Sequence, residues 1–225
     1  MRILFTAAEE EELITAKQAF NSLAKNEQEK LDITFMLTGI GTTSTSYRLT
    51  KLLSNADKVY DLVVNIGIAG SFTENFPIGS VARVDREHFG DLGFETFGGF
   101  QTLFDYNILD ADTFPFKGGA LHSPVLSDRI ESRMAIYKKA TGVTVQTVSG
   151  LPEKTKQLRD DFLPQIESME GAAFFYVCIS EKVAFIELRS VSNEVGERDR
   201  KKWNIPLALE SLKTANKRLL EALID

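Results

Sequence analysis

Apolar positions along the chain fall into short dense runs that alternate with longer segments of helical spacing. Dense runs of β-branched and apolar residues predict strands, at Arg2–Ala8, Asp32–Thr38, Asp61–Ile68, Ile78–Asp85, Val143–Val148 and Val183–Val191. Helical spacing predicts helices between them, at Leu13–Leu23, Ser46–Leu53, Asp128–Thr141, Lys154–Phe162 and Pro206–Ile224. Strands that alternate with helices are typical of an α/β fold.

Length and composition narrow the class of protein. With 225 residues, 43% of them hydrophobic and 26% charged, and with no internal repeat or linker, the chain is expected to form one domain over residues 1–225. A net charge of −6 argues against a nucleic-acid-binding surface. No apolar run approaches the ~20 residues that a membrane helix needs, and the first residues lack the pattern of a signal peptide.

The reactive side chains give little support for a disulfide or a metal site. Cys178 is the single cysteine and cannot form an internal disulfide, so a cytoplasmic protein is the simplest expectation. His88 and His122 do not share a ligand-like spacing with each other or with Cys178. We therefore expect no metal.

The end of the strand at Val183–Val191 is the first candidate binding site. Ser192 and Asn193 follow this strand directly and precede a charged loop that runs to Lys202. Ligands of open α/β sheets bind outside the carboxyl ends of the strands, so both side chains are candidate ligand contacts. Serine and asparagine are also ordinary turn residues, and the local sequence supports the two interpretations about equally.

Three segments carry a resemblance to a known family. Met-Glu-Gly-Ala-Ala at 169–173, Glu-Leu-Arg-Ser-Val-Ser-Asn at 187–193 and Arg-Asp-Arg-Lys-Lys-Trp-Asn-Ile-Pro at 198–206 resemble the nucleoside phosphorylase and nucleosidase superfamily. The resemblance is closest to the futalosine hydrolases, and it extends over roughly the whole chain but is weakest at residues 86–118. It implies a three-layer α/β/α fold with a central mixed, twisted sheet. It also implies hydrolysis of a small-molecule nucleoside, no cofactor, and a homodimer or larger homo-oligomer.

The first predicted helix begins with four acidic residues, Glu9 to Glu12. Acidic side chains suit the positive end of a helix dipole, and the residues alone do not single out one of the four. The resemblance implies that Glu12, which immediately precedes the first apolar residue of the helix, is the general base that acts on the attacking water.

The resemblance also places the ribose contacts. Glu170 accepts hydrogen bonds from the 2′ and 3′ hydroxyls, and Met169 packs beneath the sugar. Main chain near Ile68, Ala69 and Gly70 borders the base, since small residues let a flat ring lie close, although a tight turn against the core explains them equally well.

The remaining base contacts imply which purine leaves. The resemblance implies that the end of the strand predicted at Val143–Val148 lies over the purine and that Asn193 contacts the purine. An amide NH₂ donates to acceptors, and N7 and O6 of hypoxanthine are both acceptors. Adenine-releasing members carry Asp in place of Asn193. Ser192 stands beside Asn193 as a further substrate contact.

The positions that bind phosphate in phosphorylases indicate whether phosphate or water is the nucleophile. They hold Asn65 and Ile68 here instead of Arg and Ser, which favours water. A methylthioadenosine/S-adenosylhomocysteine nucleosidase, a purine nucleoside phosphorylase and a non-enzymatic nucleoside-binding protein are the alternatives.

Two further segments are distinctive. Gly39-Ile40-Gly41 follows a predicted strand, but it lacks the third glycine of a dinucleotide site. The segment from 87 to 116 is dense in phenylalanine, which is typical of core or subunit-interface packing more often than of a ligand cage. Its phenylalanines are Phe89, Phe94, Phe97, Phe100, Phe104, Phe114 and Phe116.

Overall fold

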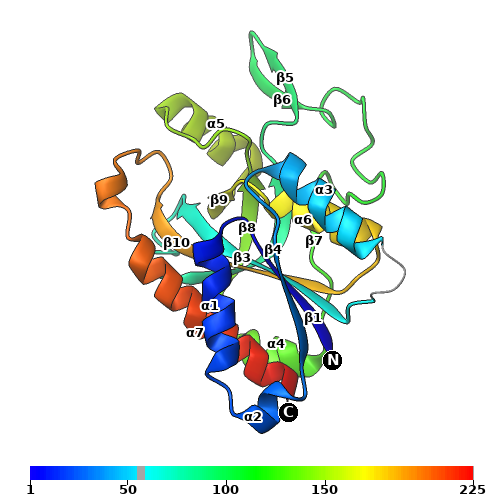
Figure 1. The fold of residues 1–225 in the computed structure, drawn as a ribbon. Coiled ribbons are helices and arrows are strands. Elements are labelled where there is room, and N and C mark those ends of the chain that lie inside the picture. Colours follow the sequence, from blue (N-terminus) through cyan, green and yellow to red (C-terminus); the bar gives the residue numbers. More distant parts are fainter. Residues whose placement is uncertain (55–58, 225) are drawn as a thin grey trace.

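The computed structural model describes residues 1–54 and 59–224. A central sheet carries most of its strands (Figure 1). These are β1 (Arg2–Ala7), β2 (Asp32–Leu37), β3 (Leu62–Ser71), β4 (Val81–Phe89), β7 (Leu121–His122), β8 (Lys139–Thr144), β9 (Ile166–Ser168) and β10 (Phe185–Glu194).

The sheet is mixed and closes on itself. Its order is β10-β4-β8-β9-β3-β1-β2, and β10 also pairs with β3, so β3, β10, β4, β8 and β9 form a ring. β3 and β10 are parallel, whereas β10 pairs with β4, and β3 with β9, in the antiparallel sense. The ring joins strands from both halves of the chain, and their ends therefore meet at one place.

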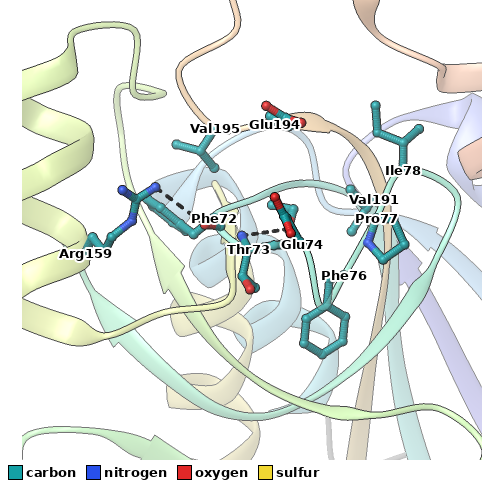
Figure 2. Close-up of a pocket in the computed structure, with 11 residues that line it drawn as sticks. Phe72, Thr73, Glu74, Phe76, Pro77, Ile78, Arg159, Val191, Glu194 and Val195 are labelled. Carbon is teal, nitrogen blue, oxygen red and sulfur yellow. Dashed lines mark hydrogen bonds between the residues drawn. The ribbon is translucent and has the colours of Figure 1, made fainter.

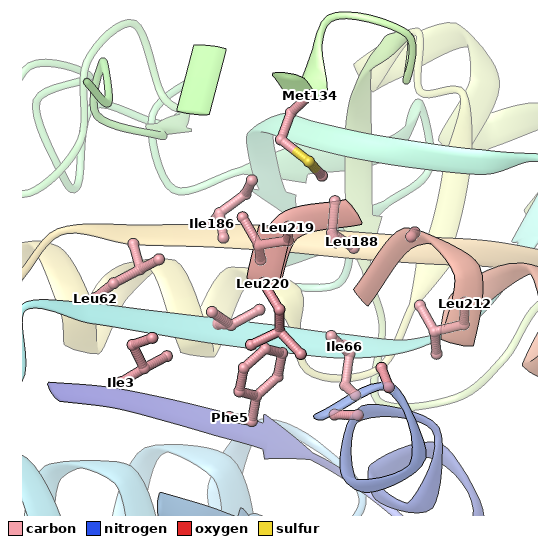
Figure 3. Packing of buried hydrophobic residues seen from close by; sticks show 14 of the residues in the cluster. Ile3, Phe5, Leu62, Ile66, Met134, Ile186, Leu188, Leu212, Leu219 and Leu220 are labelled. Carbon is pink, nitrogen blue, oxygen red and sulfur yellow. The ribbon is translucent and has the colours of Figure 1, made fainter. Parts of the chain in front are cut away.

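Helices cover both faces of this sheet. α1 (Glu10–Asn21), α4 (Asp128–Met134) and α7 (Ile205–Ile224) share one apolar cluster with β1, β3 and β10. Figure 3 shows side chains of α7 lying over those of these strands, among them Leu212, Leu219 and Leu220. α3 (Thr42–Leu53) and α6 (Gly171–Ser180) pack on the opposite face. The three-layer α/β/α fold is confirmed.

Three further helical segments are described. α2 (Lys25–Gln28) precedes β2, α5 (Pro152–Phe162) precedes β9, and a single 3₁₀ turn, η1 (Arg200–Lys202), precedes α7. Pro152 stands in the first turn of α5, where a missing N–H has no cost.

Several predicted element boundaries are wrong. The strand predicted at Val183–Val191 is β10, which begins at Phe185 and includes Ser192 and Asn193, so these two residues do not follow the strand as predicted. The helix predicted at Asp128–Thr141 ends at Met134, and the strand predicted at Val143–Val148 is β8, which begins at Lys139 and ends at Thr144. Parallel pairing of β8 with β4 decides the conformation of this stretch, because tertiary pairing overrides a weak local pattern. Val148 consequently lies in the loop that follows the strand.

The strand predicted at Ile78–Asp85 is β4, which begins three residues later, at Val81, and ends four residues later, at Phe89. Gly79 has a φ of +87°, and the Ser80 N–H donates to the Pro77 carbonyl at 2.9 Å. A turn therefore occupies the predicted start of the strand.

The phenylalanine-rich segment forms a hairpin and a long loop. β5 (Gly93–Thr96) and β6 (Gly99–Thr102) pair with each other and project from the body, at the top of Figure 1. Some rings pack inward, since Phe116 contacts Phe104 and Phe89 with centroids 5.3 and 6.4 Å away. Phe97 is fully exposed, and Phe114 is 64% exposed. The segment is thus partly core and partly open surface.

Candidate active site

All nine predicted site residues line one cavity of about 250 Å³. It lies where β3 and β10 end and α1 and α6 begin. The nine are Glu12, Ile68, Ala69, Gly70, Val148, Met169, Glu170, Ser192 and Asn193.

A second cavity, of about 520 Å³, lies beyond the same strand ends (Figure 2). Its lining includes Phe72, Thr73, Glu74 and Arg159, and it contains none of the nine predicted residues. Arg159 of α5 reaches across to the Phe72 carbonyl at 3.5 Å. The smaller cavity is the candidate active site, because three buried carboxyls and an amide converge in it.

Glu12 is the one buried acid of the four at the start of α1. Its Oε1 accepts from the Ile68 N–H at 2.9 Å, and its Oε2 accepts from the Glu9 N–H at 3.2 Å. Burial raises the pKa of Glu12 above its usual value of 4.5, although Arg189 and the Ile68 N–H counteract part of the rise. A carboxyl with a raised pKa at the cavity wall is suited to take a proton from water.

Glu170 stands at the N-terminus of α6, where a negative charge is favoured by the helix dipole. Its Oε1 accepts from the Gly41 N–H at 3.0 Å, so the glycine turn after β2 serves as a hydrogen-bond donor to this carboxyl. Its Oε2 lies 3.4 Å from Nη1 of Arg189.

Arg189 joins the two carboxyls from beneath the cavity. It is 1% exposed, and a Cβ atom at Gly67 would lie 2.2 Å from its Nη1 and 2.9 Å from Glu12 Oε1. Only glycine leaves room there for both groups. Burial alone disfavours the charge, but Glu187, Glu170 and Glu12 outweigh it and raise the pKa of Arg189 above its ordinary value.

Further acids lie deeper behind Arg189. Glu187 is fully buried, accepts from Arg189 Nε at 3.0 Å, and accepts from Asn65 Nδ2 at 2.8 Å. Glu87 is also fully buried and accepts from Thr144 Oγ1 at 2.8 Å. Burial and the neighbouring Glu187 raise the pKa of Glu87 well above 4.5.

The two deep carboxyls lie side by side. A Cβ atom at Gly171 would be 2.3 Å from Glu87 Oε1 and 2.8 Å from Glu187 Oε1. Such a pair is accommodated when one member is a neutral acid. Glu87, Glu187 and Arg189 were not predicted as site residues. Charge inside the apolar run Val183–Val191 was an available signal for Glu187 and Arg189, whereas Glu87 lies among other charged residues of β4 and had no such signal.

Asn193 and Ser192 define the base end of the cavity. The Ser192 hydroxyl donates to Asn193 Oδ1 at 2.7 Å, and Asn193 Nδ2 donates to the Glu194 carbonyl at 2.8 Å. A bulge in the pairing of β10 with β3 lies between Val191 and Asn193, so both side chains reach the cavity. The amide is thereby held with a second N–H available to a ligand.

Seven lining residues were not predicted as site residues. Arg198 and Trp203 come from the charged loop after β10, and the guanidinium lies over the indole ring at 5.2 Å. Glu167 and Ser168 come from β9, a strand of only three residues that the sequence pattern did not reveal. The other three are Ala8, Glu9 and Ile40.

The described residues hold no group of three His, Cys, Asp or Glu side chains that could bind a metal ion. In the same part of the chain, no helix is long and apolar enough to cross a membrane.

Comparison with known proteins yields consistent relatives. The family model of the phosphorylase superfamily matches residues 7–225. The futalosine hydrolase of Streptomyces coelicolor is 34% identical over 69% of this chain, which spans just under two thirds (63%) of that protein. The futalosine hydrolase of Thermus thermophilus is 30% identical over 83% of this chain and 80% of its own length.

Among solved structures, a 5′-methylthioadenosine/S-adenosylhomocysteine nucleosidase from Colwellia psychrerythraea, in complex with adenine, superposes with a TM-score of 0.77. The match covers 99% of this chain and 96% of that one at 18% identity. This likeness concerns the fold.

Proposed function

Because the chain belongs to the phosphorylase superfamily and, within it, to the family of the futalosine hydrolases, we propose that it hydrolyses the N-glycosidic bond of futalosine. The products are hypoxanthine and dehypoxanthine futalosine, in a step of menaquinone biosynthesis. The observation that carries the proposal is the convergence of Glu12, Glu170 and Asn193 on one cavity. The chain acts as a single nucleosidase domain, without a cofactor, in a homodimer or larger homo-oligomer.

Each converging group has a part in the reaction. Glu12 takes a proton from the water that attacks the anomeric carbon, and the purine leaves with the electron pair of the C–N bond. A proton from solvent neutralises the leaving base, and Glu12 returns its own proton to solvent after product release. Positive charge develops on the ribose, and the Glu170 carboxylate favours it while accepting from the sugar hydroxyls. Arg189 holds Glu170 by an ion pair and lies next to Glu12.

Water is the proposed nucleophile because the relevant positions do not suit phosphate. Asn65 is neutral and buried, and its side chain bonds to Glu187 and Thr6. Ile68 lines the cavity with an apolar side chain. These contacts support hydrolysis over phosphorolysis.

Asn193 supports a 6-oxopurine as the leaving base. Its free amide N–H is a donor, and hypoxanthine offers N7 and O6 as acceptors. A nucleosidase that releases adenine from methylthioadenosine or aminodeoxyfutalosine is the second candidate, favoured by the fold shared with the adenine complex described above. Asparagine in place of the aspartate of that group argues against it.

The test is to incubate the purified protein with futalosine, inosine, methylthioadenosine and aminodeoxyfutalosine, with and without phosphate. We expect hypoxanthine from futalosine at a rate independent of phosphate, detected by chromatography of free base and sugar product. A ribose-1-phosphate-type product contradicts hydrolysis. Preferential release of adenine contradicts the base assignment, and binding without release of any base contradicts the enzyme.

A further inference from the structure

Glu167 of β9 is a buried carboxyl in the candidate active site with no part in the mechanism above. It is 7% exposed and lines the same cavity as Asn193. Its Oε1 accepts from the Ser149 N–H at 3.1 Å, and its Oε2 accepts from the Ser149 hydroxyl. Each carboxylate oxygen can accept more than one hydrogen bond, so Glu167 retains acceptor capacity toward the cavity.

The sheet register places Glu167 opposite Asn193. Gly70 on β3 is the partner of Glu167 on β9 and also of Asn193 on β10. Neighbouring strands are about 4.8 Å apart, so the Cα atoms of Glu167 and Asn193 flank Gly70 at a separation of roughly 10 Å. Register partners direct their side chains to the same face of a sheet. A carboxyl and an amide therefore stand on either side of one glycine.

Gly70 leaves the space between them open. A Cβ atom at this position would lie 3.3 Å from Asn193 Nδ2 and 2.9 Å from a methyl of Val195. Bare backbone consequently forms the floor between the two polar groups, and a flat ring can lie over it.

The two groups match the edges of one kind of base. A 6-oxopurine presents N7 and O6 as acceptors and, next to O6, N1–H as a donor. A 6-aminopurine presents N1 as an acceptor, which a carboxylate repels. We infer that Glu167 is a specificity-determining residue, which accepts the N1–H of the 6-oxopurine while the one free N–H of Asn193 is shared between N7 and O6. The inference rests on the proposed function and names the second contact of the same base.

The surroundings of Glu167 increase its need for a donor. Burial raises the pKa of Glu167, and its bonds from Ser149, together with Arg198 and Lys154, counteract part of that rise. An N–H from the base would compensate for lost hydration in the same way.

The test measures the dissociation constants of hypoxanthine and adenine by calorimetry for the wild type and for Glu167→Gln. A glutamine can turn its NH₂ toward N1 of adenine, so hypoxanthine binding weakens while adenine binding strengthens. We expect the ratio of the two constants to move toward adenine by about 10- to 100-fold, the size expected for one misplaced buried hydrogen bond. Misfolding weakens both bases together, so opposite changes distinguish base reading from a structural role.

Glu153→Gln is the matched control, because this glutamate at the start of α5 is exposed and does not line the cavity. It should leave the ratio unchanged. A test without mutation uses 1-deazahypoxanthine, in which C–H replaces N1–H, and we expect the wild type to bind it about 10- to 100-fold more weakly than hypoxanthine.

The two proposals fail in different ways. One outcome overturns the role of Glu167 alone. In it, the wild type prefers hypoxanthine and binds the 1-deaza analogue equally well, and Glu167→Gln changes the ratio of the hypoxanthine and adenine dissociation constants by no more than about twofold. A wild type that prefers adenine overturns the 6-oxopurine assignment, and with it the N1–H contact.

Discussion

The interior end of the active-site cavity and the phenylalanine-rich segment reverse the usual distribution of charge and apolar surface. Behind the cavity, Glu87, Glu187 and Arg189 are almost fully buried. On the β5–β6 hairpin and the loop after it, Phe97 and Phe114 are mostly exposed. Removing one member of a buried ion pair typically costs about 3–5 kcal/mol, whereas exposed rings contribute little to the stability of the chain that carries them.

The comparison separates two tasks. Burial fixes the groups that carry the proposed chemistry, and the hydrogen bonds described above hold them in place. The exposed rings instead offer apolar surface to something else, and we propose that a neighbouring subunit and the aryl end of the substrate are what they meet. Changes in the buried region should therefore act on chemistry and stability, and changes in the exposed segment should act on assembly and substrate affinity.

The largest effect is expected from Glu12→Gln. The variant keeps an acceptor for the Ile68 N–H but cannot take a proton, so turnover should fall by about 10²- to 10⁴-fold with hypoxanthine binding retained. Steady-state kinetics and calorimetry measure the two effects. Glu10→Gln is the control, since Glu10 is exposed and pairs with Lys17 at 2.7 Å. Turnover near that of the wild type in Glu12→Gln shows that another group is the base.

As the proposed base, Glu12 should also set the acid limb of the pH profile. The base must be ionised, and its pKa lies above 4.5, so kcat/KM should decline as the pH falls through a value higher than that of an ordinary glutamate. Glu10→Gln should not move this limb. An acid limb at or below pH 4.5 contradicts the assignment.

Glu87 tests the stability of the buried region. Glu87→Leu removes the acceptor of the Thr144 hydroxyl and a neighbour of Glu187, at an expected cost of about 1–3 kcal/mol in the free energy of unfolding. Glu87→Gln keeps polar groups in both places and should fold with near wild-type stability. Equal destabilisation by both variants contradicts a specific polar contact. Chemical denaturation monitored by circular dichroism provides the measurement.

The sign of the pH effect at Glu87 follows from its raised pKa. The folded state holds this proton more tightly than the unfolded state, so Glu87 reduces stability progressively as the pH rises above 4.5 toward the folded-state pKa. Glu87→Gln has no proton to lose there. The stability of the variant relative to the wild type should therefore increase with pH over that interval, and a difference that is constant with pH contradicts the expectation.

Asn193→Asp probes the base end of the same cavity. A carboxylate would place an acceptor against O6, which is itself an acceptor. A protonated acid could donate to N7 and accept a hydrogen bond from a 6-amino group. The ratio of kcat/KM for futalosine to that for aminodeoxyfutalosine should fall by about 10- to 100-fold, at about 1.4 kcal/mol per factor of ten. A ratio within about twofold of the wild type means that Asn193 does not read position 6.

The smallest effect on stability is expected in the exposed segment. Phe97→Ser removes a fully exposed ring, so the free energy of unfolding should change by less than about 0.5 kcal/mol. We expect weaker self-association in sedimentation velocity. We also expect the substitution to raise the KM for futalosine more than it raises the KM for inosine. Val125→Ser, at an exposed site outside the segment, is the control. Unchanged association and KM in Phe97→Ser contradict the assigned role.

The sequence predicted the parts of the site that follow directly from a strand or a helix start. Asn193 follows a dense apolar run, Glu12 lies in the first turn of α1 and Glu170 precedes α6, so a sequence pattern together with a family resemblance sufficed to identify them. Their catalytic and binding roles stay predictions. The alternation of strands and helices indicates the α/β class, and the family resemblance implied the three-layer arrangement, which the family and fold matches confirm.

Other features depend on tertiary pairing and could not be predicted from the local sequence pattern. The hydrogen-bond partners of the two buried glutamates become apparent only in the folded structure, where Arg189 donates to Glu187 and Thr144 donates to Glu87. Glu167 lies in a three-residue strand with no periodicity of its own, and only the register with Gly70 gives it a place. The end of α4 at Met134 was missed because the pairing of β8 with β4, and not local preference, sets the conformation after it.

The closed ring of strands has a consequence for the time at which the enzyme first becomes active. β3 and β10 are adjacent in space but lie at residues 62–71 and 185–194, and contacts between such distant segments form slowly. A chain emerging from the ribosome holds Glu12 long before, and Glu170 shortly before, Arg189 and Asn193 exist to complete the cavity. Activity therefore reports the last stage of folding, and a nascent or partly folded chain cannot cleave its substrate.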